Sequence, residues 1–486
     1  MHLVLINPPF IFSHRNEIIY SHCLGILYIA AYARSKGHQV HVIDALGEGI
    51  YNRKYFPDGL VKVGLSSKDI VARIPADVDL IGFSVPFSHV AQISHEIIAD
   101  IKKKFPSIPI VMGGVYPSTQ PKLAAASLAD YIVVGEGEVP VVKLLDSLQA
   151  GGIQSLPAGV IRSSDPGNSN QISPFYLEQV ESLPFPARDL VSFARYAGRS
   201  PRGIRTFRTA SIITSRGCPF DCEFCSVHPV CGYRWRPRSA QSVLQEIDEL
   251  QHQFQVNLIE IEDDNFTLLP ERAMEILEGI IDRNRQGREI HWLCANGLRI
   301  DTLTEPLLRK ISQSNCRTIN IALEHGSEAV LQSMNKKLNL SKVLEVVRFI
   351  HEYRIPSQIF TIYGYPGETR ERFEEAVANY QKIRQIAPGI RIKFFHLQPY
   401  PGTKITQRAI QAGWLPDNVF STTEKIRHFS TNSAIWIETP DFDKKEILRR
   451  RKVLQETFIE KRKRSFRSIV RKFIPDKLMD FLHRDN

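Results

Sequence analysis

The sequence of 486 residues lacks any run of about 18 apolar residues, the length that a membrane-spanning helix requires. Its first residues, MHLVLINPPF, also lack the basic start and the small-residue cleavage site of a signal peptide, and they predict a buried strand. We therefore expect a cytoplasmic protein. The chain is too long for one ordinary domain, so we expect about two or three.

Cysteines are few, and their number, seven, is odd. Four of them, Cys218, Cys222, Cys225 and Cys231, fall within fourteen residues. A disulfide framework is not expected of such a set in a large cytoplasmic chain, so the cluster favours metal binding or redox chemistry.

Outside residues 444–486 the chain has almost no net positive charge. Residues 444–486 hold 15 Lys or Arg and 6 Asp or Glu, a net charge of +9 out of the chain's +10. An enzyme that acts on nucleic acid would more often carry basic residues over its catalytic body, so we expect no nucleic-acid partner. Five apolar residues in the segment recur with helical spacing and predict one helix face: Phe466, Ile469, Val470, Phe473 and Ile474. That helix would either make peripheral contact with the inner face of a membrane or pack on the protein.

The first 150 residues alternate apolar strand patterns with helix patterns. The predicted strands are HLVLIN (2–7), QVHVIDA (39–45), DLIGFSV (79–85), IPIVMGG (108–114) and DYIVVGEGE (130–138). Such alternation predicts a Rossmann-like parallel sheet covered on both faces, with ligands bound beyond the carboxyl ends of its strands. The loops there contain the candidate contacts Ser84, Gly113, Gly114, Ser118, Gly135 and Glu136.

A second series of strand patterns begins at about Ala210. Its members are ASIITS (210–215), NLIEIED (257–263), IHWLCAN (290–296), RTINIAL (317–323), QIFTIYG (358–364) and RIKFFHL (391–397). With helix patterns between them, they predict a (β/α)6-type partial TIM barrel. The expected α/β fold thus has a Rossmann-like domain (1–150), a linker with room for a short hairpin (151–205), the barrel (206–435) and a basic, helical C-terminal extension (436–486).

The segment SRGCPFDCEFCSVHP directly follows the first barrel strand and spaces its cysteines as C-x3-C-x2-C. Three thiolates on a tight loop can hold three irons of a 4Fe–4S cube, which leaves the fourth iron open to a small molecule. Cys218, Cys222 and Cys225 are the candidate ligands. Structural zinc, which needs four ligands, is the alternative, and His228 or Cys231 would complete that site.

This segment resembles the signature of the radical S-adenosylmethionine superfamily, and the resemblance continues to about residue 410. IEIEDDNFT (259–267) resembles the second strand, which implies that Asp263 and Asp264 face the methionine part of the cofactor. IALEHGSE (321–328) resembles the fourth-strand region, which places Glu324 and Ser327 near the ribose or methionine end.

Two further segments extend the resemblance. FTIYGYPGET (360–369) resembles the fifth strand and its glycine-rich turn, which implies cofactor contacts from Gly364, Gly367 and Glu368. FHLQPYPGT (395–403) resembles the sixth strand. Barrel sites are built at the carboxyl ends of strands, where Asp263, Glu324, Gly364 and His396 all fall. The alternatives are that Asp263 and Asp264 end a strand and cap the next helix, and that Glu324 pairs with an arginine for stability.

The N-terminal domain resembles the cobalamin-binding domain that precedes the barrel in one branch of this superfamily, through LINPPF, IVMGGVYPS and ADYIVVGEGE. The paired glycines allow backbone to approach a flat ligand, and Tyr116 and His89 are candidate neighbours of the cobalt. Domains that ligate cobalt by histidine carry D-x-H-x-x-G. The nearest string here, Asp44 to Gly49, has Leu46 in the histidine position, so any cobalamin would lack that ligand. A purely structural Rossmann-like domain is the alternative.

The resemblance implies an enzyme that uses a 4Fe–4S cluster and S-adenosylmethionine to generate a 5′-deoxyadenosyl radical. It also implies cobalamin-dependent methylation of an unactivated carbon in a small-molecule substrate, with an electron donor such as flavodoxin or ferredoxin. Membrane docking of the basic helix would fit a lipid-like substrate. An oxidative cyclase or a rearrangement enzyme of the same branch is the alternative. A non-catalytic iron–sulfur or zinc protein is an alternative of another class. The sequence indicates no catalytic acid or base.

Overall fold

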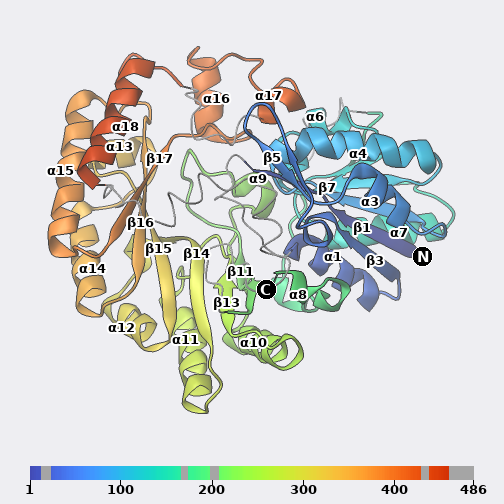
Figure 1. The fold of residues 1–486 in the computed structure, drawn as a ribbon, viewed down its shortest axis with the longest axis horizontal. Coiled ribbons are helices and arrows are strands. Elements are labelled where there is room, and N and C mark those ends of the chain that lie inside the picture. The colour runs from blue at the N-terminus through green and yellow to red at the C-terminus, as the bar shows by residue number, and fades with distance from the viewer. Residues whose placement is uncertain (13–22, 166–172, 197–206, 428–436, 459–486) are drawn as a thin grey trace, which may run out of the picture.

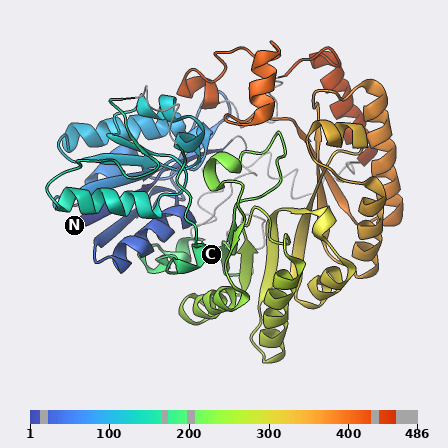
Figure 2. The same cartoon turned by 180° about the vertical axis from the view of Figure 1, so that it is seen from behind.

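The computed structural model describes residues 1–12, 23–165, 173–196, 207–427 and 437–458. Two α/β domains lie side by side, the N-terminal domain at the right of Figure 1 and the barrel at the left. The segment that carries β11 (Ser215–Arg216) and α9 (His228–Cys231) lies between them, and Figure 2 shows it from behind.

The N-terminal sheet has the strand order β3–β1–β6–β7–β8–β9. The first five strands are parallel, and β9 is antiparallel to β8. The bounds are His2–Asn7 (β1), Gln39–Asp44 (β3), Leu80–Ser84 (β6), Ile110–Gly113 (β7), Tyr131–Val133 (β8) and Val160–Arg162 (β9). The five predicted strands are confirmed. Strand β9 belongs to the expected linker, where it extends this sheet.

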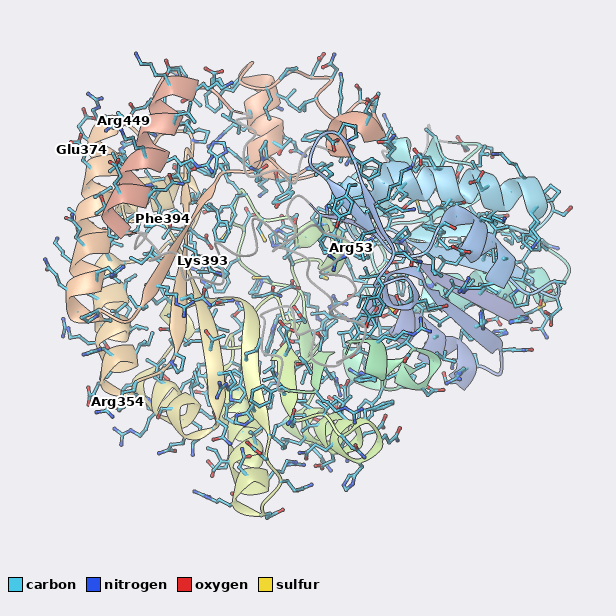
Figure 3. The ribbon with its side chains drawn as sticks, viewed as in Figure 1. Arg53, Arg354, Glu374, Lys393, Phe394 and Arg449 are labelled. Carbon is cyan, nitrogen blue, oxygen red and sulfur yellow. The ribbon has the colours of Figure 1, made fainter. Side chains whose placement is uncertain are left out.

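Alternate residues of β1 face opposite sides of the sheet, as strand geometry requires. Leu3 and Leu5 pack with α1 (Leu24–Ser35) and α7 (Glu138–Gln149), whereas Val4 and Ile6 pack with α4 (Ala91–Lys104). A small antiparallel sheet was not foreseen. It consists of β2 (Phe10–Phe12), β5 (Val61–Val63) and β4 (Arg53–Tyr55), whose first residue is labelled in Figure 3.

The second domain is an open barrel with the strand order β10–β13–β14–β15–β16–β17. All neighbouring strands are parallel, so the predicted partial barrel is confirmed. The strand bounds are Thr209–Ile212 (β10), Leu258–Ile261 (β13), His291–Arg299 (β14), Cys316–Glu324 (β15), Ser357–Tyr363 (β16) and Arg391–His396 (β17). The outer helices are α10 (Ala240–Phe254), α11 (Pro270–Arg285), α12 (Glu305–Gln313), α14 (Leu340–Glu352) and α15 (Arg370–Ile386).

Strand alternation separates the outer layer of the barrel from its lumen. On β17, Phe394 packs against Tyr380 of α15 and Phe458 of α18 (Lys444–Phe458), so it belongs to the outer layer. Its neighbour Lys393 therefore faces the lumen, where its Nζ lies 5.8 Å from the ring centre of Phe360. Both residues are labelled in Figure 3.

The chain after β17 returns to both domains. Helix α16 (Lys404–Gln411) begins beside the cysteine loop, where Ile405 N donates to Glu223 O at 3.0 Å. Helix α17 (Thr423–Arg427) reaches α4 in Figure 1, and Ile426 is fully buried in the N-terminal core. Part of the segment assigned to the barrel thus packs on the first domain. The predicted helix face at residues 466–474 lies outside the described residues. Within them, no helix has the length and apolar character needed to span a membrane.

Candidate cofactor site

Two adjacent carboxylates at the end of β13 hold the cysteine loop. Asp263 accepts hydrogen bonds from Thr214 N at 2.6 Å, Thr214 Oγ1 at 2.5 Å and Ser215 Oγ at 2.6 Å. Asp264 accepts one from Gly217 N at 3.1 Å, and burial raises the pKa of Asp264 to about 6. Gly217 has a φ of +83°, and a Cβ there would lie 2.3 Å from Arg234 O, so only glycine fits before the first cysteine.

The three predicted cluster ligands lie on this loop, half-buried, and the charges of Cys218 and Cys222 both act on Cys225. Burial raises the pKa of all three thiols, to about 12 for Cys225, while Lys336 and Arg299 act in the opposite sense on Cys222. Two donors point at sulfur: Asn265 Nδ2 lies 3.9 Å from Cys218 Sγ, and Arg299 Nη1 lies 4.0 Å from Cys222 Sγ. Such donors stabilise thiolates, so the loop fits an iron–sulfur cluster.

The two residues that would complete a zinc site have other partners. His228 Nε2 lies 3.1 Å from Cys218 O, and its ring stacks on Tyr233 with centroids 3.8 Å apart. Cys231 lines a cavity between the domains. Among the described residues, no three His, Cys, Asp or Glu side chains lie close enough to hold one metal ion. A 4Fe–4S cluster does not require three ligands around one metal ion, because its three thiolates bind three different irons.

Glu324 lies beside the cysteine loop, at the end of β15. Its φ is +70°, an unusual backbone conformation for a glutamate, and its Oε1 pairs with Lys336 Nζ at 3.0 Å. Both side chains are largely buried, and Lys336 is also the leading charge that lowers the pKa of the Cys222 thiol. This ion pair therefore acts on the charge of a predicted cluster ligand.

The other predicted cradle residues lie in the expected turns, with their polar groups used inside the protein. Ser327 Oγ donates to Glu375 at 2.6 Å. The Glu368 carboxylate is fully buried and accepts from Gly364 N at 2.5 Å. Gly364 and Gly367 have positive φ, and a Cβ on Gly364 would collide with Ile447 of α18. The predicted contact of the 364–368 turn with a cofactor, through its backbone groups, and the predicted contact of Ser327 both stay predictions.

His396 lies at the carboxyl end of β17, as expected, but its side chain does not face the lumen. It ends β17 on the outer side, with its ring 5.5 Å from that of Tyr363, and no hydrogen-bond partner among the described residues reaches its ring nitrogens. Burial lowers the pKa of His396 to about 4. The side chain is a neutral, buried histidine beneath α18.

A cavity of about 380 Å³ separates the N-terminal sheet from the cysteine segment. Five of the six predicted N-terminal contacts line it: Ser84, Gly113, Gly114, Gly135 and Glu136. The sixth, Ser118, supports the wall, because its Oγ accepts from Gly135 N at 3.0 Å. From the barrel side come Ser215, Arg216, Cys231 and Asp264.

Gly113 and Gly114 are each glycine for a different reason. A Cβ on Gly113 would meet only Val133, at 3.7 Å, so its absence leaves space open on the cavity wall. Gly114 has a φ of +115°, and a Cβ there would lie 2.7 Å from Val85 O. A smooth wall of glycine backbone at the carboxyl edge of a parallel sheet fits a broad, flat ligand such as a corrin.

The structure places three further residues that the sequence singled out in the N-terminal domain. Tyr116 is fully buried in the core and bonds to His95 Nε2 at 3.1 Å, so it does not face the cavity. His89 stacks on Phe87, which lines the cavity where His89 does not. Leu46 packs with Val61 and Val63. None of these three side chains contacts the cavity, and the histidine position of D-x-H-x-x-G is filled by a core residue.

Sequence reasoning missed Asn265, Arg299 and Lys336. Arg299 ends β14, so the rule that barrel sites form at strand ends could have found it. Asn265 follows the two aspartates already singled out. Lys336 follows α13 (Glu328–Ser333) in a turn, and nothing in its local pattern marks it.

Comparisons with known proteins agree with this geometry. A sequence profile of the radical SAM superfamily matches residues 212–379, and one of the B12 binding domain matches residues 20–145. An uncharacterized methyltransferase of Pyrococcus horikoshii, PH0819, is 28% identical over 84% of this chain and 84% of its own. Cytidylyl-2-hydroxyethylphosphonate methyltransferase of Streptomyces wedmorensis is 25% identical over 85% and 82%. The radical S-adenosylmethionine methyltransferase TsrM of Kitasatospora setae, solved with a tryptophan substrate and a SAM analogue, has the same fold, with a TM-score of 0.65 and 18% identity over 88% and 82%.

A cysteine loop on the rim of a partial barrel, with these matches, defines a radical S-adenosylmethionine enzyme. The chain belongs to the branch of that superfamily that carries an N-terminal cobalamin-binding domain. Its cofactors are a 4Fe–4S cluster, S-adenosylmethionine and cobalamin. The non-catalytic and purely structural alternatives are thereby set aside.

Proposed function

We propose that this enzyme transfers a methyl group to an unactivated carbon of a small-molecule substrate. One observation carries the proposal: the cysteine loop and the interdomain cavity share a wall. Arg216 and Cys231 line the cavity, and the three cluster cysteines lie between them in the chain. When bound, the cluster supplies an electron for cleavage of S-adenosylmethionine, and cobalamin supplies a methyl group.

The chain's own residues position these groups and exclude water. Asp263 and Asp264 fix the loop, while Arg299 and Asn265 donate toward the cysteine sulfurs. The Glu324–Lys336 pair offers one carboxylate and one ammonium to the amino and carboxylate groups of S-adenosylmethionine. The site residues Asp263, Glu324, Ser327 and 364–368 remain proposals in this role.

The substrate is proposed to occupy the barrel lumen. Phe360 and Phe395 meet edge to face there, with centroids 5.5 Å apart, and Phe395 is 40% exposed. An exposed aromatic pair favours an apolar or lipid-like portion of a substrate next to the reacting carbon. Lys393 stands beside this pair and suits an anionic group on the same molecule.

The test is an anaerobic reaction of the reconstituted enzyme with S-adenosylmethionine, methylcobalamin and a reductant, using a library of apolar and phosphonate-bearing substrates. Methyl transfer predicts 5′-deoxyadenosine together with a product heavier by one CH₂ unit. Formation of 5′-deoxyadenosine with a product of unchanged or lower carbon count would contradict methylation and favour an oxidative cyclase or a rearrangement. The matched control is a chain with Cys218, Cys222 and Cys225 replaced by alanine.

Two partner proposals extend this function. An electron donor such as flavodoxin or ferredoxin would reduce the cluster in the cytoplasm. Peripheral contact with the inner face of the membrane would involve the basic segment after α18, which lies outside the described residues. Deleting residues 462–486 should weaken binding to anionic liposomes at low salt, and unchanged binding would remove the membrane proposal.

A further inference from the structure

Four buried charges join the two domains at the cavity wall, and we call them the Glu–Arg bridge: Glu136, Glu138, Arg216 and Arg236. Arg236 pairs with Glu136 through both guanidinium nitrogens at 2.8 Å. Arg216 Nη2 donates to Glu138 Oε1 at 2.7 Å, and its Nη1 lies 3.6 Å from Glu136 Oε1. No side chain of the bridge is more than 9% exposed. The charges balance, two of each sign.

The bridge connects the two cofactor sites directly. Both glutamates stand at the turn from β8 into α7, on the wall of the interdomain cavity. Arg216 is separated from the first cluster cysteine by Gly217 alone. Arg216 and Arg236 are partners in the antiparallel pair β11–β12 (Arg236–Pro237), which closes the cysteine segment. The bridge therefore holds both ends of that segment.

Backbone groups on both sides also bind the bridge. Arg236 Nη2 donates to Cys231 O at 2.6 Å, and Leu177 N donates to the same Glu136 carboxylate at 2.7 Å. Bidentate Arg–carboxylate pairs fix orientation as well as distance. Apolar residues of similar size would often join the domains equally well, because buried ion pairs are costly to desolvate. Stability alone therefore does not account for four charges at this place.

We propose that the Glu–Arg bridge couples cobalamin binding in the cavity to the geometry of the cysteine loop, with Glu136 and Arg236 as positioning residues. A ligand in the cavity orders the β8–α7 turn, and the bridge transmits that order to β11 and β12. Coupling between binding sites is reciprocal, so a loaded cluster must tighten cobalamin binding by the same factor. The inference rests on the two cofactors of the family and does not depend on methyl transfer.

The experiment titrates hydroxocobalamin by absorption into the full chain, prepared anaerobically with and without its reconstituted cluster. Wild-type protein should bind about tenfold more tightly with the cluster present, within the usual range of coupling between sites. Cobalamin should also change the electron paramagnetic resonance spectrum of the reduced cluster. In E136Q/R236Q both charges are removed together, so no lone charge is left buried. Whatever its absolute affinity for cobalamin, this variant should show less than about a twofold difference in affinity between the cluster-free and cluster-loaded forms, and an unchanged spectrum.

Two controls separate coupling from folding. D189N breaks an exposed ion pair, in which Arg34 Nη1 lies 2.8 Å from Asp189, and should keep the wild-type coupling. E136L/R236M restores apolar packing and should likewise show no difference in cobalamin affinity between the cluster-free and cluster-loaded forms. Equal affinities in the wild type, or full coupling in E136Q/R236Q, would overturn the proposal. Failure of both double variants to load either cofactor would also overturn it, because the bridge would then be a folding element.

Discussion

Arg450 Nη1 donates to Glu368 Oε2 at 2.9 Å, and both side chains are fully buried although 82 positions separate them. Glu368 also accepts from Gly364 N, and its other oxygen lies 3.0 Å from His325 Nε2. Helix α18 is thus attached to the glycine-rich turn after β16. The charges of Arg449, which precedes Arg450, and of Glu374 on α15, both labelled in Figure 3, attract each other across the two helices.

Arg450→Met should lower the free energy of unfolding by about 3–5 kcal/mol, because it leaves the Glu368 carboxylate buried without its cation. Chemical denaturation measures this loss. Lys452→Met is the matched control, since Lys452 and Glu456 are exposed and such pairs contribute about 1 kcal/mol or less. Equal midpoints for the two variants would show that the buried pair contributes no more than the exposed one.

The parallel strands of both domains could be predicted because each is a short apolar run between helix patterns, and the cysteine loop because its spacing is local. The roles of Glu368 and Ser327 could not be predicted from the sequence. Each residue lies in the expected turn. However, Glu368 binds Arg450 and Ser327 binds Glu375, and only folding brings these partners together. The return of Ile426 to the N-terminal core is hidden for the same reason. Sequence spacing reports neighbours along the chain, and these contacts are distant in it.

Lys336→Met should weaken binding of S-adenosylmethionine to the cluster-loaded enzyme by about tenfold or more, because the Glu324 carboxylate loses the charged partner that orients it. Calorimetric titration measures the dissociation constant, and iron content should stay at the wild-type level. Lys337→Met, at the exposed next position, is the control. If the two variants bind S-adenosylmethionine equally well, the pair has no part in the cofactor site.

Alanine at Cys218, Cys222 or Cys225 should remove the cluster, because a cube with two protein thiolates is poorly held. Iron and sulfide content and the charge-transfer absorption after anaerobic reconstitution measure the loss. Cys231→Ala should keep the full iron content, since Cys231 faces the cavity. Loss of metal in Cys231→Ala, with zinc present in the wild type, would support the four-ligand zinc site.

Acid should destabilise the protein through His396, whose burial lowers its pKa to about 4, against about 6.5 in an unfolded chain. Between these values the unfolded chain binds a proton that the folded protein does not, so stability falls as the pH drops from 6.5 toward 4. At the acid end of this range the lowered pKa costs about 3 kcal/mol of folding stability. Above pH 7 the histidine causes no such loss. His396→Phe should therefore lose less stability than the wild type between pH 7 and 4, measured by urea unfolding at each pH.

His252→Phe, at an exposed position of α10, serves as the control. Parallel pH profiles for the wild type and His396→Phe would mean that folding does not lower the pKa of His396.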